Sequence, residues 1–137
     1  MKLLLIISLL TSGWFIVYLE PSSLNAYNSE TLAKASFSHV VLFYLKHPGN
    51  QAERQQFETS LNTFIKNSQH VKSIHLGTPA SSDRAVVDKS YTYIMVLTFA
   101  SSEDQEKYQE EIGHKKFIEE SEHLWQKVVV YDSENMW

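Results

Sequence analysis

The residues of this chain with the clearest capacity for chemistry are its histidines and tyrosines, and two of them, Tyr108 and His114, stand close together in the sequence. A neutral histidine is the side chain best suited to accept a proton near pH 7. A tyrosine hydroxyl nearby can polarise a carbonyl group or hold an enolate. The pair predicts a proton-transfer site, and the alternative is that Tyr108 packs its ring in the core while His114 caps a helix.

Three further residues lie in segments that resemble strands, and we expect them to line a ligand cavity: His39, His75 and Tyr93. A histidine on a strand can point into a barrel cavity and assist proton transfer there. The alternative is that each histidine is satisfied by a backbone partner and has a structural role only.

Several other chemistries lack the residues that they need. The chain has 6 histidines but no pair at the helical spacing of a zinc site, so we expect no metal and no cofactor. It has no cysteine, which excludes a thiol nucleophile and disulfides. No Gly-x-Ser-x-Gly elbow is present, so serine hydrolase chemistry has no support.

Size and charge narrow the class of protein further. A chain of 137 residues has room for one domain and a targeting segment. Its net charge of −4 comes from 16 acidic and 12 scattered basic residues, so the basic footprint of a nucleic-acid binder is missing. The composition, 43% hydrophobic and 20% charged, is that of an ordinary globular protein.

The elements that must position these residues follow from periodicity and turn signals. A capping box at Asn50 and Glu53 starts the first predicted helix, and Ser101 or Ser102 starts a second, short helix that Gly113 ends. The Pro-, Ser- and Asp-containing residues 78–90 predict a long loop. Strands are expected at residues 37–46, 71–77, 91–99 and 127–131, and helices after residues 50, 101 and 113.

This order predicts an α+β fold, a ferredoxin-like βαββαβ unit with an antiparallel sheet. The helices of such a unit cover one face of the sheet and leave the other bare. We expect Val41, Phe43, Ile94 and Val96 on the bare face, which is then too apolar to stand in water. A second copy is the economical cover, so the pattern predicts a homodimer that forms a dimeric α/β barrel.

The N-terminal residues 3–19 form an almost unbroken apolar stretch that follows Lys2. This stretch is longer than a usual signal-peptide core and at the short limit for a spanning helix. Trp14 and Tyr18 lie where aromatic rings settle at a membrane interface. Length favours an uncleaved membrane anchor, a cleaved signal peptide is the alternative, and both predict an extracytoplasmic domain.

The predicted organisation therefore has four parts. Residues 1–20 are a signal peptide or membrane anchor, and residues 21–36 are a polar linker rich in Ser and Asn. The folded domain spans residues 37–132, and residues 133–137 form a short tail.

Four segments of the domain resemble the stress-responsive α/β-barrel (Dabb) family. They are SHVVLFYLK at 38–46, YTYIMVLTF at 91–99, GHKKF at 113–117 with Tyr108 before it, and WQKVVVYD at 125–132. The resemblance implies a dimeric barrel that can hold a small hydrophobic ligand between each sheet and its helices. It places His114 and Tyr108 at the positions of the His and Tyr that olivetolic acid cyclase, an enzyme of this family, uses in an aldol cyclisation.

Three functions are carried forward from the sequence. The first is an exported or anchored stress-response domain that binds a small apolar ligand. The second is a lyase or polyketide-cyclase-like enzyme with His114 as general base and Tyr108 as orienting acid. The third is a monooxygenase, by analogy of architecture only. The chain departs from the family at Glu111 and Ile112, which replace a His-Pro turn common before the histidine.

Overall fold

The computed structural model describes residues 36–136 of the chain, and these form one α+β unit. The strands are β1 (Phe37–Leu45), β2 (Ser73–Gly77), β3 (Tyr93–Phe99) and β4 (Trp125–Glu134). The helices are α2 (Gln51–Asn67), α3 (Ser102–Glu110) and α4 (Ile112–Ser121), followed by the 3-10 turn η1 (Glu122–Leu124). This order confirms the predicted ferredoxin-like fold.

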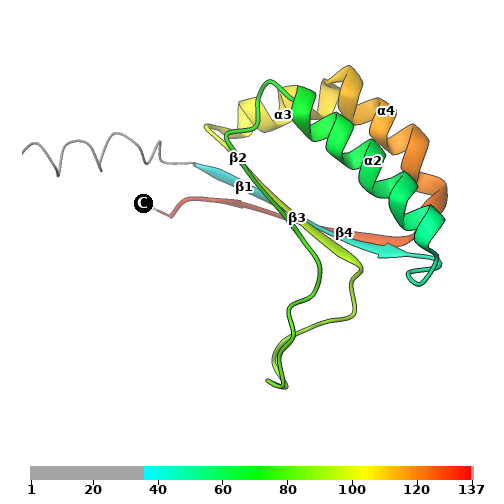
Figure 1. Ribbon diagram of the computed structural model, residues 1–137. Coiled ribbons are helices and arrows are strands. Elements are labelled where there is room, and N and C mark those ends of the chain that lie inside the picture. The colour runs from blue at the N-terminus through cyan, green and yellow to red at the C-terminus, as the bar shows by residue number, and fades with distance from the viewer. Residues whose placement is uncertain (1–35, 137) are drawn as a thin grey trace, which may run out of the picture. The chain divides into compact units, whose positions relative to one another are not determined.

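The four strands form one antiparallel sheet in the order β2-β3-β1-β4. The helices α2, α3 and α4 all lie on one side of this sheet (Figure 1). Because side chains alternate across a strand, each strand sends every second residue toward the helices. The alternating burial of β1 and β3 is the result of this one-sided cover.

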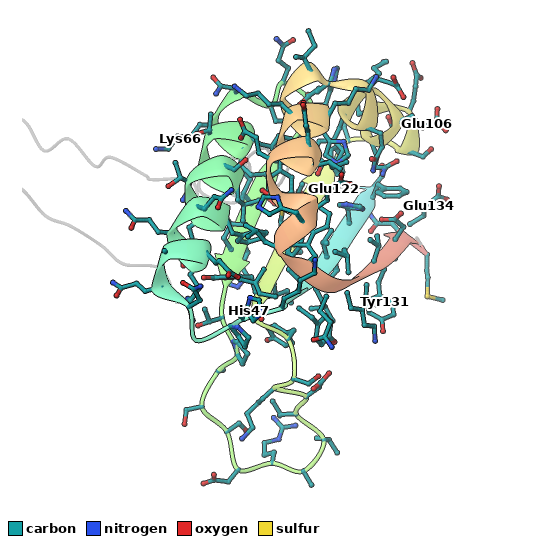
Figure 2. The ribbon with its side chains drawn as sticks, turned by 90° about the vertical axis from the view of Figure 1, so that its right-hand side faces the viewer. His47, Lys66, Glu106, Glu122, Tyr131 and Glu134 are labelled. Atoms are coloured by element: carbon teal, nitrogen blue, oxygen red, sulfur yellow. The ribbon has the colours of Figure 1, made fainter. Side chains whose placement is uncertain are left out.

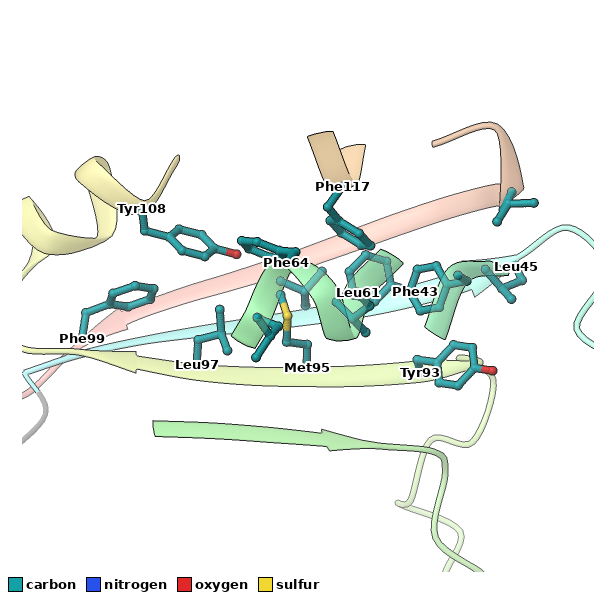
Figure 3. Close-up of a cluster of buried hydrophobic side chains, with 14 of the residues drawn as sticks. Phe43, Leu45, Leu61, Phe64, Tyr93, Met95, Leu97, Phe99, Tyr108 and Phe117 are labelled. Carbon is teal, nitrogen blue, oxygen red and sulfur yellow. The ribbon is translucent and has the colours of Figure 1, made fainter. Parts of the chain in front are cut away.

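The core between sheet and helices is unusually aromatic. Phe57 and Phe64 of α2 pack against rings from the sheet and from α4, with Phe64 stacked on Phe117 at 5.4 Å between ring centroids. Such ring pairs contribute about 0.5 to 1.5 kcal/mol each beyond the area that they bury. Figure 3 shows this cluster running along the whole length of the sheet.

The assignment of Val41 and Phe43 to the bare face of the sheet is wrong. Both side chains are buried under the helices, at 4% and 2% exposure. The register pairs Val41 with Met95 and Val40 with Val96, so Val41 lies on the opposite face from Val96. The bare face instead carries the alternate residues of β1 together with the predicted residues of β3: Val40, Leu42, Ile94 and Val96.

The helix starts are formed as the sequence predicts. The Asn50 side chain accepts hydrogen bonds from the backbone N–H groups of Ala52 and Glu53 at 3.1 and 3.3 Å, and its amide donates to the Glu53 carboxylate at 2.9 Å. Ser101, one of the two predicted caps, accepts from the Asp104 N–H at 3.1 Å. Caps of this kind stabilise a helix by about 0.5 to 2 kcal/mol.

Several boundaries differ from the prediction, and β2 and β3 each begin two residues later than predicted, at Ser73 and Tyr93. Helix α3 ends at Glu110 and α4 begins at Ile112, so Glu111 and not Gly113 forms the break between them. The glycine lies inside α4, where the helical pattern of the flanking residues outweighs its low propensity. Strand β4 is also longer than predicted at both ends, because β1 pairs with it along its full length.

The connection between β2 and β3 is a long loop that projects away from the sheet in two views (Figures 1 and 2). The predicted membrane anchor or signal peptide and the linker lie outside the described residues, apart from Ser36. Within residues 36–136, no helix is long and apolar enough to cross a membrane.

Candidate functional site

A cavity of about 190 Å³ lies between the sheet and the helices α3 and α4. Its polar lining consists of His39, Tyr108, Gln109 and His114. The rest of the lining is apolar or aromatic: Val41, Phe43, Met95, Phe117, Ile118, Trp125, Val128 and Val130. A concave apolar space with a few converging polar groups is the usual form of a small-molecule site.

Tyr108 reaches this cavity from the last turn of α3. Its ring packs against Phe99 and Phe64, with centroids 5.1 and 5.5 Å apart, and the residue has no exposed surface. Within the described part of the chain, the hydroxyl has no hydrogen-bond partner. Burial, together with the nearby carboxylates of Glu111 and Asp132, raises the pKa of Tyr108, so its hydroxyl stays protonated.

His114 lies on the first turn of α4, beside Tyr108. The two ring centroids are 4.8 Å apart, and Nδ1 of His114 is 3.1 Å from the carbonyl oxygen of Gln109. Because a carbonyl can only accept, Nδ1 carries the hydrogen, and Nε2 is left with the lone pair of a neutral imidazole. Burial lowers the pKa of His114, which favours this neutral form.

His39 completes the polar end of the cavity from strand β1. Its ring centroid is 5.8 Å from that of Tyr108, and its Nδ1 is 2.6 Å from a carboxylate oxygen of Asp132. The His39 side chain is buried, whereas that of Asp132 is 43% exposed. The structure thus brings together His39, Tyr108 and His114, all three of which the sequence proposed as site residues.

Asp132 belongs to the candidate site through its contact with His39, and sequence reasoning missed it. The sequence marks Asp132 only as the last residue of the predicted domain. The signal that could have found it is the β1–β4 register, which places Asp132 directly across from His39. Alternation along β4 puts it on the same face as Val130 and Val128, toward the helices.

The assignment of Tyr93 to the ligand cavity is wrong. Tyr93 faces α2, where its hydroxyl donates to the Glu58 carboxylate and the Arg54 guanidinium lies 5.1 Å from its ring centroid. Burial and the hydrogen bond to Glu58 raise the pKa of Tyr93 to about 12. Figure 3 shows Tyr93 at the opposite end of the aromatic cluster from Tyr108. The Tyr93 side chain therefore packs against α2 and links this helix to the sheet.

The assignment of His75 to the cavity is also wrong. His75 is exposed on β2, the edge strand, and pairs with Val96. This pairing places it on the bare face of the sheet, away from the helices. Among the residues that the structure describes, no group of three or more His, Asp or Glu side chains is arranged to hold a metal ion.

The sheet order, the one-sided helices and the cavity between them define a ferredoxin-like α/β-barrel domain. Residues 37–135 match the model of the stress-responsive A/B barrel domain, and the chain belongs to this family. No curated protein matches the chain.

Solved structures share the fold at low sequence identity. A protein of Arabidopsis thaliana is 22% identical, with a TM-score of 0.60 over 74% of this chain and 96% of its own. The hydroxynitrile lyase of Passiflora edulis is 21% identical, with a TM-score of 0.60 over 74% and 94%. A Dabb family protein of Mesorhizobium loti is 18% identical, with a TM-score of 0.61 over 74% and 97%.

Proposed function

We propose that this stress-responsive A/B barrel domain binds a small, largely apolar molecule in the cavity between its sheet and the helices α3 and α4. The observation that carries the proposal is the cavity itself, with apolar walls and one polar end at His39, Tyr108 and His114. Its volume of about 190 Å³ is below the usual range of drug-sized sites, so the ligand is a small molecule.

The binding unit that we propose is a homodimer. The bare face of the sheet carries Val40, Leu42, Ile94 and Val96, whose partly exposed side chains need a cover. Structural neighbours from Thermobifida fusca and Bacteroides fragilis are described as dimeric proteins with a ferredoxin-like fold. A second copy placed on this face would bury the apolar patch and close a barrel.

The second candidate function is proton-transfer catalysis, as in a lyase or cyclase. It is favoured by the pairing of the Tyr108 hydroxyl with a neutral His114 whose Nε2 can accept a proton. The neighbouring hydroxynitrile lyase of Passiflora edulis has the same fold. In this function Tyr108 would polarise a carbonyl group while His114 removes a proton beside it.

Native mass spectrometry of the protein purified from its own host tests ligand binding directly. We expect a small molecule to be retained by the wild type and lost in Ile118→Trp, which fills the cavity. The matched control is Ile112→Trp on the same helix, because Ile112 is 86% exposed and does not line the cavity. Equal retention of the ligand by both variants would place it elsewhere.

We further propose that the domain is held outside the cytoplasm by residues 3–19. The proposal is supported by the apolar run, the early Lys2 and the aromatic residues at its end. Protease added to intact cells, or to spheroplasts where an outer membrane exists, should digest the domain while a cytoplasmic control survives. Protection equal to that of the control would contradict the proposal, and a carbonate wash separates an anchored chain from a released one.

A further inference from the structure

The polar end of the cavity is lined by neutral hydrogen-bonding groups, and one carboxylate, that of Asp132, lies beside it. The Asp132 carboxylate lies against His39. The Glu111 carboxylate is bound by the Ser68 hydroxyl and two backbone N–H groups at the end of α2, outside the cavity lining. Among the described residues that line the cavity, none is a lysine or an arginine. The electrostatic potential at the polar end is therefore negative or neutral, and no cationic side chain of the lining can pair with an anionic ligand.

The His39–Asp132 pair does not change this conclusion. With Nδ1 of His39 and the Asp132 oxygen 2.6 Å apart, a protonated imidazole would be balanced by the carboxylate, and a neutral imidazole would leave a net charge of −1. The pair therefore has a net charge of zero or −1 in either state. An anionic ligand would gain no net attraction from it.

Two buried hydrogen-bond donors of the cavity lining have no partner among the described residues, Trp125 Nε1 and the Tyr108 hydroxyl. Trp125 packs against Phe43 and Phe117, so the donor at the polar end is the Tyr108 hydroxyl. It belongs to a side chain with no exposed surface, which lines the cavity. A buried hydroxyl without a partner is costly, so a ligand that accepts a hydrogen bond there would relieve that cost. His114 presents a lone pair at Nε2, which would not attract an anion. His39 already contacts the carboxylate of Asp132.

We propose, resting on the ligand-binding function above, that the cavity selects neutral carbonyl compounds with a short apolar body and rejects the corresponding carboxylates. The carbonyl oxygen accepts from the Tyr108 hydroxyl, and its α-carbon comes to lie near Nε2 of His114. The apolar body follows the cavity wall along Phe117 and Val128. A carboxylate in the same position would lie near Asp132, with no lysine or arginine in the cavity lining to balance its charge.

A matched pair of probes tests this selectivity on the full-length protein. Heptan-2-one and heptanoate have similar length and apolar surface but differ in charge at pH 7.5. We expect calorimetric or NMR titration to give an affinity at least about tenfold higher for the ketone, because an unpaired carboxylate is costly to bury. Equal or tighter binding of heptanoate would overturn the selectivity and leave the ligand-binding function standing. Failure of both probes, and of heptane, to bind would contradict that function as well.

A gain-of-function variant tests the electrostatic cause. Val130 lines the cavity and is 47% exposed, so a lysine there can place its ammonium group at the cavity mouth without being buried. We expect Val130→Lys to raise heptanoate affinity at least about tenfold, and Val130→Gln, which adds a polar group without charge, to leave it weak.

Melting temperatures establish first that both variants are folded. Wild-type heptanoate affinity in a folded Val130→Lys protein would contradict the proposed electrostatic cause. If Val130→Lys does not fold, the comparison of the two probes on the wild type decides alone.

Discussion

At the polar end of the cavity, the state of single side chains decides what the site can do. His114 is useful as a proton acceptor only while it is neutral, and its burial favours that form. The hydrogen bond from Nδ1 to the Gln109 carbonyl fixes which nitrogen faces the cavity. The protonation state of His114 therefore affects both its capacity to accept a proton and the stability of the fold.

This linkage gives a pH-dependent contribution of His114 to stability. Because the folded state lowers the histidine pKa from its ordinary 6.5, the unfolded chain binds more protons below neutral pH. The stability difference between wild type and His114→Gln should therefore be constant above about pH 6.5. As the pH falls from there through the lower pKa of the folded state, the wild type should lose stability relative to His114→Gln. Urea unfolding at several pH values measures it, and a difference that stays flat down to pH 5 would contradict the burial of a neutral imidazole.

Tyr108→Phe separates the stability of the fold from the function of the site. The ring contacts are kept, and a buried hydroxyl without a partner is removed. We expect the free energy of unfolding to stay the same or rise by up to about 1 kcal/mol, while the affinity for a carbonyl ligand falls about twofold to tenfold. Thermal unfolding and ligand titration measure the two effects. A loss of more than about 1 kcal/mol would mean that the hydroxyl has a structural partner.

At the scale of the elements, the break between α3 and α4 determines how Tyr108 and His114 face each other. Glu111 forms this break, and its carboxylate accepts from the Ser68 hydroxyl at 3.1 Å and from the backbone N–H groups of Gln69 and His70 at 2.9 and 3.3 Å. Glu111 and Ile112 stand where the family resemblance implies a His-Pro turn. The carboxylate instead ties the junction to the end of α2.

Glu111→Ala should therefore loosen the junction as well as remove three hydrogen bonds. We expect a loss of about 1 to 3 kcal/mol in the free energy of unfolding, because hydrogen bonds to a charged group are among the stronger ones. The control is Glu110→Ala, which removes only an exposed ion pair to Lys115 and should destabilise the fold much less than Glu111→Ala. Denaturant unfolding compares the two variants, and equal losses would show that Glu111 does not act as a tie.

The elements also show which parts of the structure the sequence could predict. Alternation and capping signals are local, so the strands, the Asn50 and Ser101 caps and the element order were predictable from spacing alone. The register between strands is not local. The faces of Val41 and Phe43 and the His39–Asp132 contact depend on how β1 pairs with β3 and β4, which spacing along one strand cannot fix.

The same limit explains the outcome at the candidate site. Tyr108 and His114 are joined by a short stretch of one helix pair, so their proximity follows from the sequence. Tyr93 and His75 each lie on a strand, and the pairing with neighbouring strands determines which face of the sheet each side chain is on. Tyr93 meets α2 rather than the cavity, and His75 lies on an edge strand facing away from the helices.

At the scale of the whole molecule, the sheet has one face under the helices and one without cover in the described protomer (Figure 1). The central residues of that second face are Val40 and Leu42 of β1 and Ile94 and Val96 of β3. Their positions on the two middle strands make them the centre of any surface that a second copy would cover. A charge placed there would be buried in a dimer and exposed in a monomer.

Leu42→Asp should therefore dissociate the dimer. Burying an unpaired carboxylate in an interface costs several kcal/mol, whereas the same carboxylate on a solvated face costs little. Light scattering at micromolar concentration should give a dimer mass for the wild type and a monomer mass for Leu42→Asp. The matched control is Gln55→Asp on the exposed side of α2, which should remain dimeric. A monomeric wild type, or a Leu42→Asp variant with unchanged mass and melting temperature, would show that this face is not where two copies meet.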